Sequence, residues 1–511
     1  MSDRLLSVLL VTPFLGAVVL LLVPPKAKKT LRWVALVSAL PPLAIALALP
    51  LIYDHAQGGF QLQETFPLLP SLGIQYHLGV DGISVPLVIL TAFIYLTAIF
   101  TSWTLETREK EFFLFLALLV TGVYGVFVSL DLFLFFLFYE LAVLPMYLLI
   151  GIWGSTMEIP GKGPLGWTYA AVRVGIKEYG AMKLTLYLLA GSAFILVALF
   201  RLYVESGYLL PQATFDYLQL MTQHYTGGSA RTMFLLFYVG FGVLAGIWPL
   251  HTWSPDGHAA APAAGSMMHA GVLMKLGAYG VLRLGFGLFP EAAHELAWLV
   301  GGIAVINIVY GALAAGWQTD IKYLIAYSSV SHMGIVMLGL ATLNGAGIAG
   351  SVFQMVSHGL MTGLLFTLVN LIYHKAHTRD MRQMGGFGHK MPGLATCFVL
   401  AGLTSLGLPG LSGFVAEFLV FLGAWGSANP WWLFPAVLGA FVTALYVLLA
   451  VRQIFLGPEN PRYPHLPDAH GTEWLTLVVL TGLLIVLGLM PRLILDSIHV
   501  GVGEFLARLA A

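Results

Sequence analysis

Lys275 lies near the middle of a long apolar stretch, residues 261–284, with the sequence APAAGSMMHAGVLMKLGAYGVLRL. An ammonium group at the centre of a bilayer costs roughly 3 kcal/mol or more. A membrane helix that carries such a group has a use for its proton or a partner for its charge, unless the lysine sits at a helix end and reaches the lipid surface. The next basic residue is Arg283, so Lys275 is not at an end. We interpret it as a proton-carrying group inside the membrane.

Other ionisable side chains also fall inside apolar segments: Glu140, Lys183, His332, His358 and Glu417. Together with Lys275 they give, in chain order, a carboxylate, two amines, two imidazoles and a second carboxylate. Burial shifts the proton affinities of amines and carboxylates towards neutrality, and imidazole changes its charge near neutral pH. The series therefore predicts a path along which a proton passes from group to group.

Several of these residues also have a purely structural interpretation. A lone histidine in a helix of small residues can simply hydrogen-bond to neighbouring backbone. For His332 and His358 the choice between this structural role and proton transfer therefore stays open. Lys183 can instead be an anchor that extends to the membrane surface.

Three charged residues lie near the ends of apolar segments. Asp81 and Asp131 are predicted to be helix-start or turn residues, because a carboxylate accepts from the free backbone amides of a first helical turn. Lys322, in TDIKYLIAYSSV, is predicted to lie close to a membrane surface, where it either admits a proton or contacts a loop.

The composition is that of a membrane protein with many spans. Of 511 residues, 59% are hydrophobic and 9% are charged, whereas soluble domains have about 25% charged residues. The formal net charge is zero, so no basic surface for nucleic acid is expected. The one cysteine, Cys397, can form no internal disulfide and cannot by itself hold an iron–sulfur cluster or a zinc finger.

Fourteen apolar segments are long enough to cross a hydrocarbon layer of about 30 Å. The fourth and fifth are nearly fused, and we expect a turn at residues 129–131. The segments lie near residues 4–23, 31–52, 83–102, 112–130, 131–150, 182–204, 232–250, 262–288, 297–316, 321–342, 350–373, 393–423, 431–456 and 473–495.

Lysine and arginine are distributed unevenly over the loops. Loops after even-numbered segments contain no lysine, whereas loops after odd-numbered segments are basic. Because basic loops stay in the cytoplasm, the odd-numbered loops are predicted to be cytoplasmic, and both termini are predicted to lie on the other side of the cell's inner membrane. The basic residues are Lys26, Lys28, Lys29, Arg108, Lys110, Lys162, Arg173, Lys177, Lys375, Arg379, Arg382 and Lys390.

Two segments are interrupted in a similar way, by prolines at 246–262 (GIWPLHTWSPDGHAAAP) and by proline and glycines at 404–418 (TSLGLPGLSGFVAEF). Paired broken helices in matching halves are typical of inverted-repeat transporters, although ordinary proline kinks are the alternative. The fold expected is an all-α integral membrane protein with two inverted five-helix repeats, in which helices 7 and 12 are broken. The divisions are residues 1–111, 112–290 (first repeat), 291–456 (second repeat) and 457–511.

Five long motifs, in the same order along the chain, resemble those of a known protein family. They are FYELAVLPMYLLIGIWG, PLHTWSPDGHAAAPAAGSMMHAGVLMKLGAYGVLR, TDIKYLIAYSSVSHMG, HTRDMRQMGG and GLPGLSGFVAEF. Nearly the whole chain resembles the antiporter-like subunits of respiratory complex I, the proton-pumping NADH:quinone oxidoreductase, and the M-type subunit (chain 4) in particular. The wider superfamily includes Mrp sodium/proton antiporter subunits and membrane subunits of energy-converting hydrogenases.

The resemblance implies a role for each residue of the series. Glu140 matches a fifth-helix glutamate that pairs with a seventh-helix lysine, and Lys275 matches the central lysine of the eighth helix. Lys183 matches a lysine at the start of the sixth helix. The remaining matches are to connecting histidines and to a terminal acid on the twelfth helix: His332, His358 and Glu417.

The chain departs from the family pattern in the seventh segment. The family phrase resembles F-A-x-K-x-P-x-x-P-L-H, whereas residues 241–251 read FGVLAGIWPLH, with Leu244 at the lysine position and Gly246 at a proline position. Glu140 therefore lacks its expected cation, and we expect it to be largely protonated at rest. His269 offers a substitute, because it lies about 120° round the helix from Lys275 and about 9 Å along it, where it can face the broken seventh segment.

A second departure is an insertion of about 25 residues, TMEIPGKGPLGWTYAAVRVGIKEYGA, on the predicted cytoplasmic side. It carries Lys162, Arg173 and Lys177 and is either a contact element for a partner or a tolerated surface loop.

The predicted function is that of a proton-translocating membrane subunit of an NADH:quinone oxidoreductase. The resemblance implies that the chain has no redox centre, that NADH, FMN, iron–sulfur clusters and quinone belong to other subunits, and that its partners are other membrane subunits and the lipid bilayer. The transported ion is a proton or sodium. The alternatives are a cation/proton antiporter, a subunit of a hydrogenase or carbon-uptake complex, and a structural subunit whose channel Leu244 has disabled.

Overall fold

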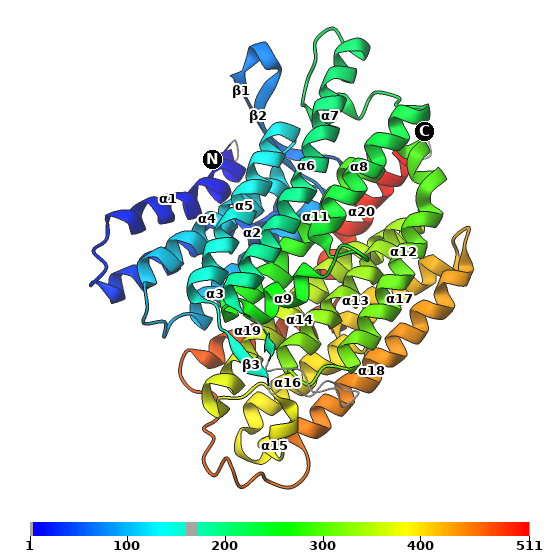
Figure 1. Ribbon diagram of the computed structural model, residues 1–511. Helices are drawn as coiled ribbons and strands as arrows, with labels where there is room; N and C mark the ends of the chain where they lie inside the picture. The colour runs from blue at the N-terminus through cyan, green and yellow to red at the C-terminus, as the bar shows by residue number, and fades with distance from the viewer. Residues whose placement is uncertain (1–3, 160–171, 175, 510–511) are drawn as a thin grey trace.

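The computed structural model describes residues 4–159, 172–174 and 176–509, and the side chains of 157–159 and 172–174 are outside that description. The chain is a bundle of helices with two small antiparallel hairpins (Figure 1). One hairpin pairs β1 (Gln61–Leu69) with β2 (Ile74–Val80), and the other pairs β3 (Met157–Ile159) with β4 (Val172–Val174). The all-α membrane class is confirmed, and the hairpins are additions that hydropathy did not reveal.

Eleven helices in the described part of the chain are long and apolar enough to cross a membrane, or up to twelve if a bent pair counts as one span. The bent pair is α19 (Glu473–Leu489) and α20 (Arg492–Leu509), at 65° to each other. The eleven are α1 (Leu5–Leu22), α2 (Lys28–Ile52), α3 (Ser84–Thr101), α4 (Glu109–Val128), α5 (Leu132–Trp153), α6 (Lys177–Leu209), α8 (Gly227–Ala245), α12 (Pro290–Gly316), α13 (Ile321–Ala341), α14 (Gly345–Ala376) and α18 (Leu433–Phe455) with its leading turn η6 (Pro430–Trp432).

Shorter elements make up the rest. Helices α16 (Pro392–Ser405) and α17 (Ser412–Trp425) are apolar but each too short to span alone. Every one of the fourteen predicted segments overlaps a helix, while the count of fourteen spans and the inverted repeats stay predictions. The remaining short elements are α7 (Tyr217–Leu220), α9 (Trp253–Ala260), α15 (Phe387–Lys390), η2 (Pro70–Leu72) and η5 (Met381–Gln383).

Both predicted interruptions are present. Helix α8 ends at Gly246, whose φ of 73° favours glycine, and α9 begins after a short irregular segment. Asn307 of α12 ties this segment down: its Oδ1 accepts from Trp248 N at 2.8 Å, and its Nδ2 donates to Val330 O at 2.8 Å. The second break, between α16 and α17, contains Gly407 and Gly410 with φ of 70° and 94°. Irregular backbone at membrane depth needs such partners, because no water is present there to replace them.

The two aspartates act as helix starters, as predicted. Asp131 accepts from Phe133 N and Leu134 N at the start of α5, in the turn that separates α4 from α5. Asp81 accepts from Ile83 N and Ser84 N just before α3. Asp81 also forms a buried ion pair with Arg283, which fastens α3 to the far end of the Lys275 helix.

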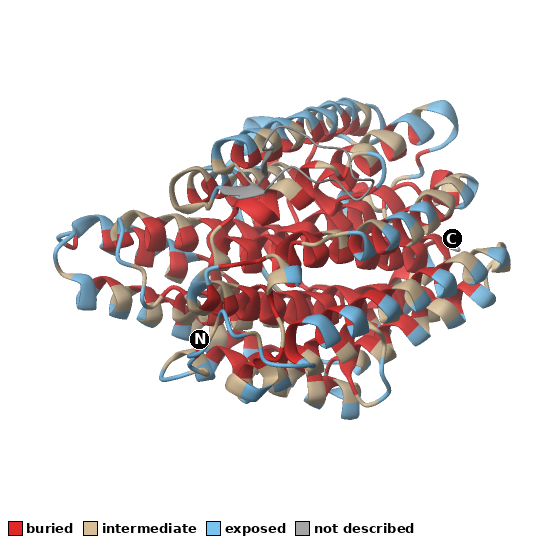
Figure 2. Ribbon diagram, turned by 60° about the horizontal axis from the view of Figure 1, so that its bottom comes forward, coloured by how far each residue is buried: buried red, intermediate tan, exposed pale blue. Residues whose placement is uncertain are grey.

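The Lys275 helix is a continuous run that changes its winding. It consists of α10 (Ala263–Met268), the π-helical η3 (His269–Leu273), α11 (Met274–Gly280) and the π-helical η4 (Val281–Phe286). π-Helical turns within α-helices are frequent at functional sites. This run and the equally buried α13 and α14 form the centre of the bundle, where Figure 2 shows continuous buried residues inside a rim of exposed ones.

Candidate functional site

The central lysine contacts a histidine of a neighbouring helix. Lys275 is fully buried on α11, and its Nζ lies 2.7 Å from Nδ1 of His358 on α14. The ammonium also donates to the carbonyl of Ala270, which lies in the π-turn η3 of the same helical run. The other ring nitrogen of His358, Nε2, is buried and has no hydrogen-bond partner among the described residues. His358 can therefore take a proton on one side and lose one on the other.

The second histidine continues the line. His332 of α13 stacks on His358 with 5.3 Å between ring centroids and 24° between ring planes. Its Nδ1 lies 2.9 Å from Ser328 O, and its Nε2 lies 3.1 Å from Ser405 O. Carbonyl oxygens only accept, and a neutral imidazole carries one N–H, so only the charged ring can donate to both. The site thus accommodates a protonated His332.

A carboxylate ends the line. Glu417, on α17 directly after the second break, places Oε1 3.7 Å from Nε2 of His332. The order in space is Lys275, His358, His332 and Glu417, so the two histidines follow in the reverse of their order in the chain. Four helices contribute one residue each. The backbone-only interpretation of the histidines is wrong for His358, which contacts Lys275, and incomplete for His332, which also faces Glu417.

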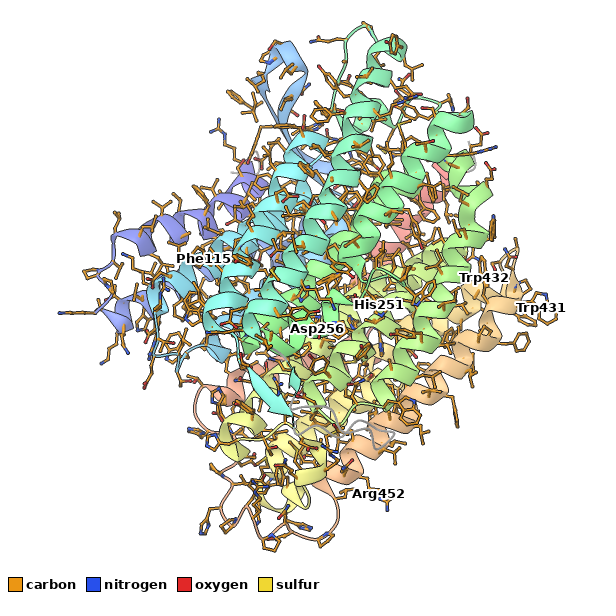
Figure 3. The ribbon with its side chains drawn as sticks, viewed as in Figure 1. Phe115, His251, Asp256, Trp431, Trp432 and Arg452 are labelled. Atoms are coloured by element: carbon orange, nitrogen blue, oxygen red, sulfur yellow. The ribbon has the colours of Figure 1, made fainter. Side chains whose placement is uncertain are left out.

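Lys183 forms an ion pair with a carboxylate of a neighbouring helix. Its Nζ lies 2.7 Å from Oδ2 of Asp256 on α9, and the hydroxyl of Tyr323 donates to the other carboxylate oxygen at 2.9 Å. The two charged side chains are 18% and 25% exposed. Asp256 and His251 lie near mid-length of the bundle, beside the break between α8 and α9 (Figure 3). Sequence reasoning missed Asp256, although a carboxylate beside the prolines of a broken segment was a usable signal.

Glu140 pairs with no cation in the part of the chain that the structure describes. Its side chain is half-buried on α5, its Oε1 is buried without a hydrogen-bond partner, and it forms no ion pair with any described residue. Leu244 is completely buried on α8, so the place of the expected lysine is apolar. This agrees with the prediction that Glu140 lacks its partner.

His269 faces the broken seventh helix, as predicted, but does not pair with Glu140. Its ring lies 4.9 Å from that of Trp253 and 4.2 Å from that of His258, both on α9. Both nitrogens of His258 and of His269 are buried and unpartnered within the described residues. His258 was missed from the sequence, although it follows Asp256 in the same proline-flanked motif.

A cavity of about 550 Å³ opens at the end of the bundle where α13 begins and α14 ends. It is lined by Lys322 and by residues 261–264, which follow the end of α9. The polar residues that line it include Glu106, His374 and Glu473.

The predicted insertion lies only partly within the described residues. Lys162 and the side chain of Arg173 lie outside them. Lys177, at the start of α6, donates to Ile152 O at 3.4 Å, and the β3–β4 hairpin forms the stem. Whether the insertion contacts a partner stays a prediction.

Comparison with known proteins places this geometry in a family. Residues 173–443 match the family model described as "NADH:quinone oxidoreductase/Mrp antiporter, TM". The chain is 37% identical to NADH-quinone oxidoreductase subunit M of Rhodobacter capsulatus, over 98% of this chain and 96% of the relative. It is 39% identical to NAD(P)H-quinone oxidoreductase chain 4 3 of Picosynechococcus sp., over 89% of this chain and 80% of the relative.

Solved structures have the same fold. A chain of respiratory complex I from Thermus thermophilus with bound NADH superposes with a TM-score of 0.86 at 27% identity, covering all of both chains. A chain of the Mrp complex from Dietzia sp. DQ12-45-1b gives a TM-score of 0.83 at 18% identity, with 100% of this chain and 99% of that chain covered, which shows the fold alone. The chain belongs to the NADH:quinone oxidoreductase/Mrp antiporter family of membrane subunits, together with subunit M and chain 4.

Proposed function

We propose that this chain translocates protons as the antiporter-like M-type membrane subunit of an NADH:quinone oxidoreductase. The observation that carries this proposal is the buried line of protonatable groups from Lys275 through His358 and His332 to Glu417. Buried ionisable groups inside a membrane are costly and mark ion pathways. A merely structural subunit would not need four of them in sequence.

The transported ion is the proton. Three of the four groups bind through nitrogen, which takes up protons, whereas hard metal cations such as sodium are held by sets of oxygen ligands. In the proposed step, the Lys275 ammonium gives a proton to Nδ1 of His358 and becomes a neutral amine, and the charged His358 then passes its Nε2 proton to the ring nitrogen that lacks one in neutral His332. Charged His332 then donates to the carbonyls of Ser328 and Ser405 and is balanced by Glu417.

Protons enter through the cavity at the end of α14. The cavity reaches residues 261–264 beside His258, whose ring contacts His269, and His269 lies on the same helical run as Lys275. The basic loops at this end favour a cytoplasmic location for the cavity, which would put both termini on the other side of the inner membrane. The ion pair between Lys183 on α6 and Asp256 on α9 supplies two charges whose separation would change the electric field at His258 and Lys275.

The internal division follows the two breaks. Residues 112–290 and 291–456 are the two inverted five-helix repeats, with 1–111 before and 457–511 after them, and the matching broken helices α8–α9 and α16–α17 support this division. NADH, FMN, iron–sulfur clusters and quinone are assigned to other subunits of the assembly, so the redox energy reaches this chain through changes in charge or shape at its interfaces.

The deciding experiment is proton pumping by the purified complex in vesicles. The proton-to-electron ratio is measured at matched electron-transfer rates for wild type, Lys275→Ala and the control Lys29→Ala, in which an exposed lysine is removed. We expect a lower ratio for Lys275→Ala only. A ratio equal to wild type would show that the channel is silent, and the chain would then be a structural subunit.

A further inference from the structure

The short helix α9 has few hydrogen bonds of its own that could fix its position in the bundle. It has eight residues, lies between the break at 246–252 and Pro262, and carries both Asp256 and His258. A helix this short leaves most of its last carbonyl groups without an intrahelical donor. The neighbours that supply those donors therefore decide where Asp256 and His258 are presented.

Three donors from three separate elements meet the C-terminal end of α9. The Arg379 guanidinium donates from Nη1 to Ala259 O at 2.9 Å. The backbone amide of Ser155 donates to Ala260 O at 2.9 Å. The Lys322 ammonium donates to Ala261 O. Two of the three donors are buried cations, which a helix C-terminus attracts because its dipole is negative there.

The two cations are held together by the start of α13. Asp320 caps α13 by accepting from Lys322 N at 2.8 Å, and its Oδ2 lies 2.9 Å from Nη2 of Arg379. The backbone of Arg379 is fixed as well, since Ile321 N donates to its carbonyl at 3.0 Å. The next residue of α13, Tyr323, contacts Asp256 itself. α13 and the loop at residue 379 thus hold α9 at its C-terminal end and at its carboxylate.

We propose that Arg379 and Lys322 form a cationic clamp that positions α9, and that Lys322 holds the backbone instead of carrying the proton. This assigns the HTRDMRQMGG and TDIK motifs a shared role, and it decides between the two roles that the sequence leaves open for Lys322. The clamp deepens the proposed function, because it sets where Asp256 and His258 stand relative to the Lys275 helix. Arg379 and Lys322 are positioning residues that act through α9.

The chemistry of lysine and arginine separates a clamp from a proton carrier. A guanidinium can donate to Ala261 O but does not lose its proton in a protein, whereas an ammonium can do both. Lys322→Arg therefore keeps the clamp and removes proton transfer, and Lys322→Met removes both. With the proton-to-electron ratio as readout, we expect Lys322→Arg to retain the ratio and Lys322→Met to lower it. If Lys322→Arg lowers the ratio as much as Lys322→Met, Lys322 is a carrier and the proposal fails.

A second readout does not depend on pumping. Backbone amides of residues 253–264 are followed by hydrogen–deuterium exchange in the intact complex, with Arg379→Gln compared with Arg382→Gln. Arg382 is in the same loop but is exposed and pairs only with Asp380 among the described residues. Loss of a charged hydrogen bond should speed exchange in α9 at least about tenfold for Arg379→Gln. Exchange unchanged from wild type would overturn the clamp.

The two readouts also separate this proposal from the proposed function. If Lys275→Ala leaves the pumping ratio unchanged while Arg379→Gln loosens α9, the chain does not pump but the clamp exists. If Lys275→Ala lowers the ratio and α9 exchanges normally in Arg379→Gln, the chain pumps without the clamp. Arg379→Lys, which keeps one donor, should give intermediate exchange and show that the loss in Arg379→Gln is not a general folding defect.

Discussion

Glu417 provides the sharpest test of the proton line, because replacing it by glutamine removes the negative charge that its carboxylate carries when ionised and almost no volume. The lost charge lies 3.7 Å from Nε2 of His332. At the effective dielectric constant of about 20 that suits protein sites, two unit charges about 4 Å apart attract by about 4 kcal/mol. That energy corresponds to about three orders of magnitude in the population of charged His332. Glu417→Gln should therefore stall transfer between His358 and His332.

The assay is the proton-to-electron ratio of the complex in vesicles, with Glu111→Gln as the control. Glu111 is a carboxylate 40% exposed, 3.5 Å from Arg108, and outside the line. We expect Glu417→Gln to lower the ratio as far as Lys275→Ala does. The double variant Lys275→Ala/Glu417→Gln should lower the proton-to-electron ratio no further than either single variant does, because the effects of residues that act in series are not additive. A normal ratio in Glu417→Gln, or additive losses in the double variant, would refute the series arrangement.

Three further predictions concern stability and can be checked by thermal unfolding of the purified complex. Lys183→Gln or Asp256→Asn alone should cost about 2 kcal/mol, because each leaves the other charge unpaired in a mostly buried site, and the double variant should recover part of that loss. Gly277→Ala should cost about 1–3 kcal/mol, because the added methyl group would meet the α8 backbone at 2.4 Å from Ala245 N and push the Lys275 helix aside. Asn307→Ala should cost about 1–3 kcal/mol and loosen the first break, because Trp248 N loses its acceptor and Val330 O loses its donor.

The membrane class and the two breaks were predictable because they depend on local properties. Hydropathy marks a span, and proline with glycine marks a break, whichever helix is nearby. The same reasoning identified Lys275, His332, His358 and Glu417, since an ionisable residue is conspicuous in an apolar segment. The turn at residues 129–131 was predictable for the same reason, because its sequence signal is also local. The β1–β2 hairpin was not predicted, because its strands lie outside the apolar segments and its pairing depends on contacts across the loop.

Pairing between helices depended on the tertiary structure. Lys183 meets Asp256 across 73 residues of chain, and His358 precedes His332 in space although it follows it in the sequence. His269 contacts His258 and not Glu140, and Lys322 reaches a backbone carbonyl on the Lys275 side of α9. The sequence by itself determined which groups are placed inside the membrane, because the cost of burying them is a property of each residue. Which group each one contacts was decided only by the packing of the helices, since rotation and depth of a helix are set by its neighbours.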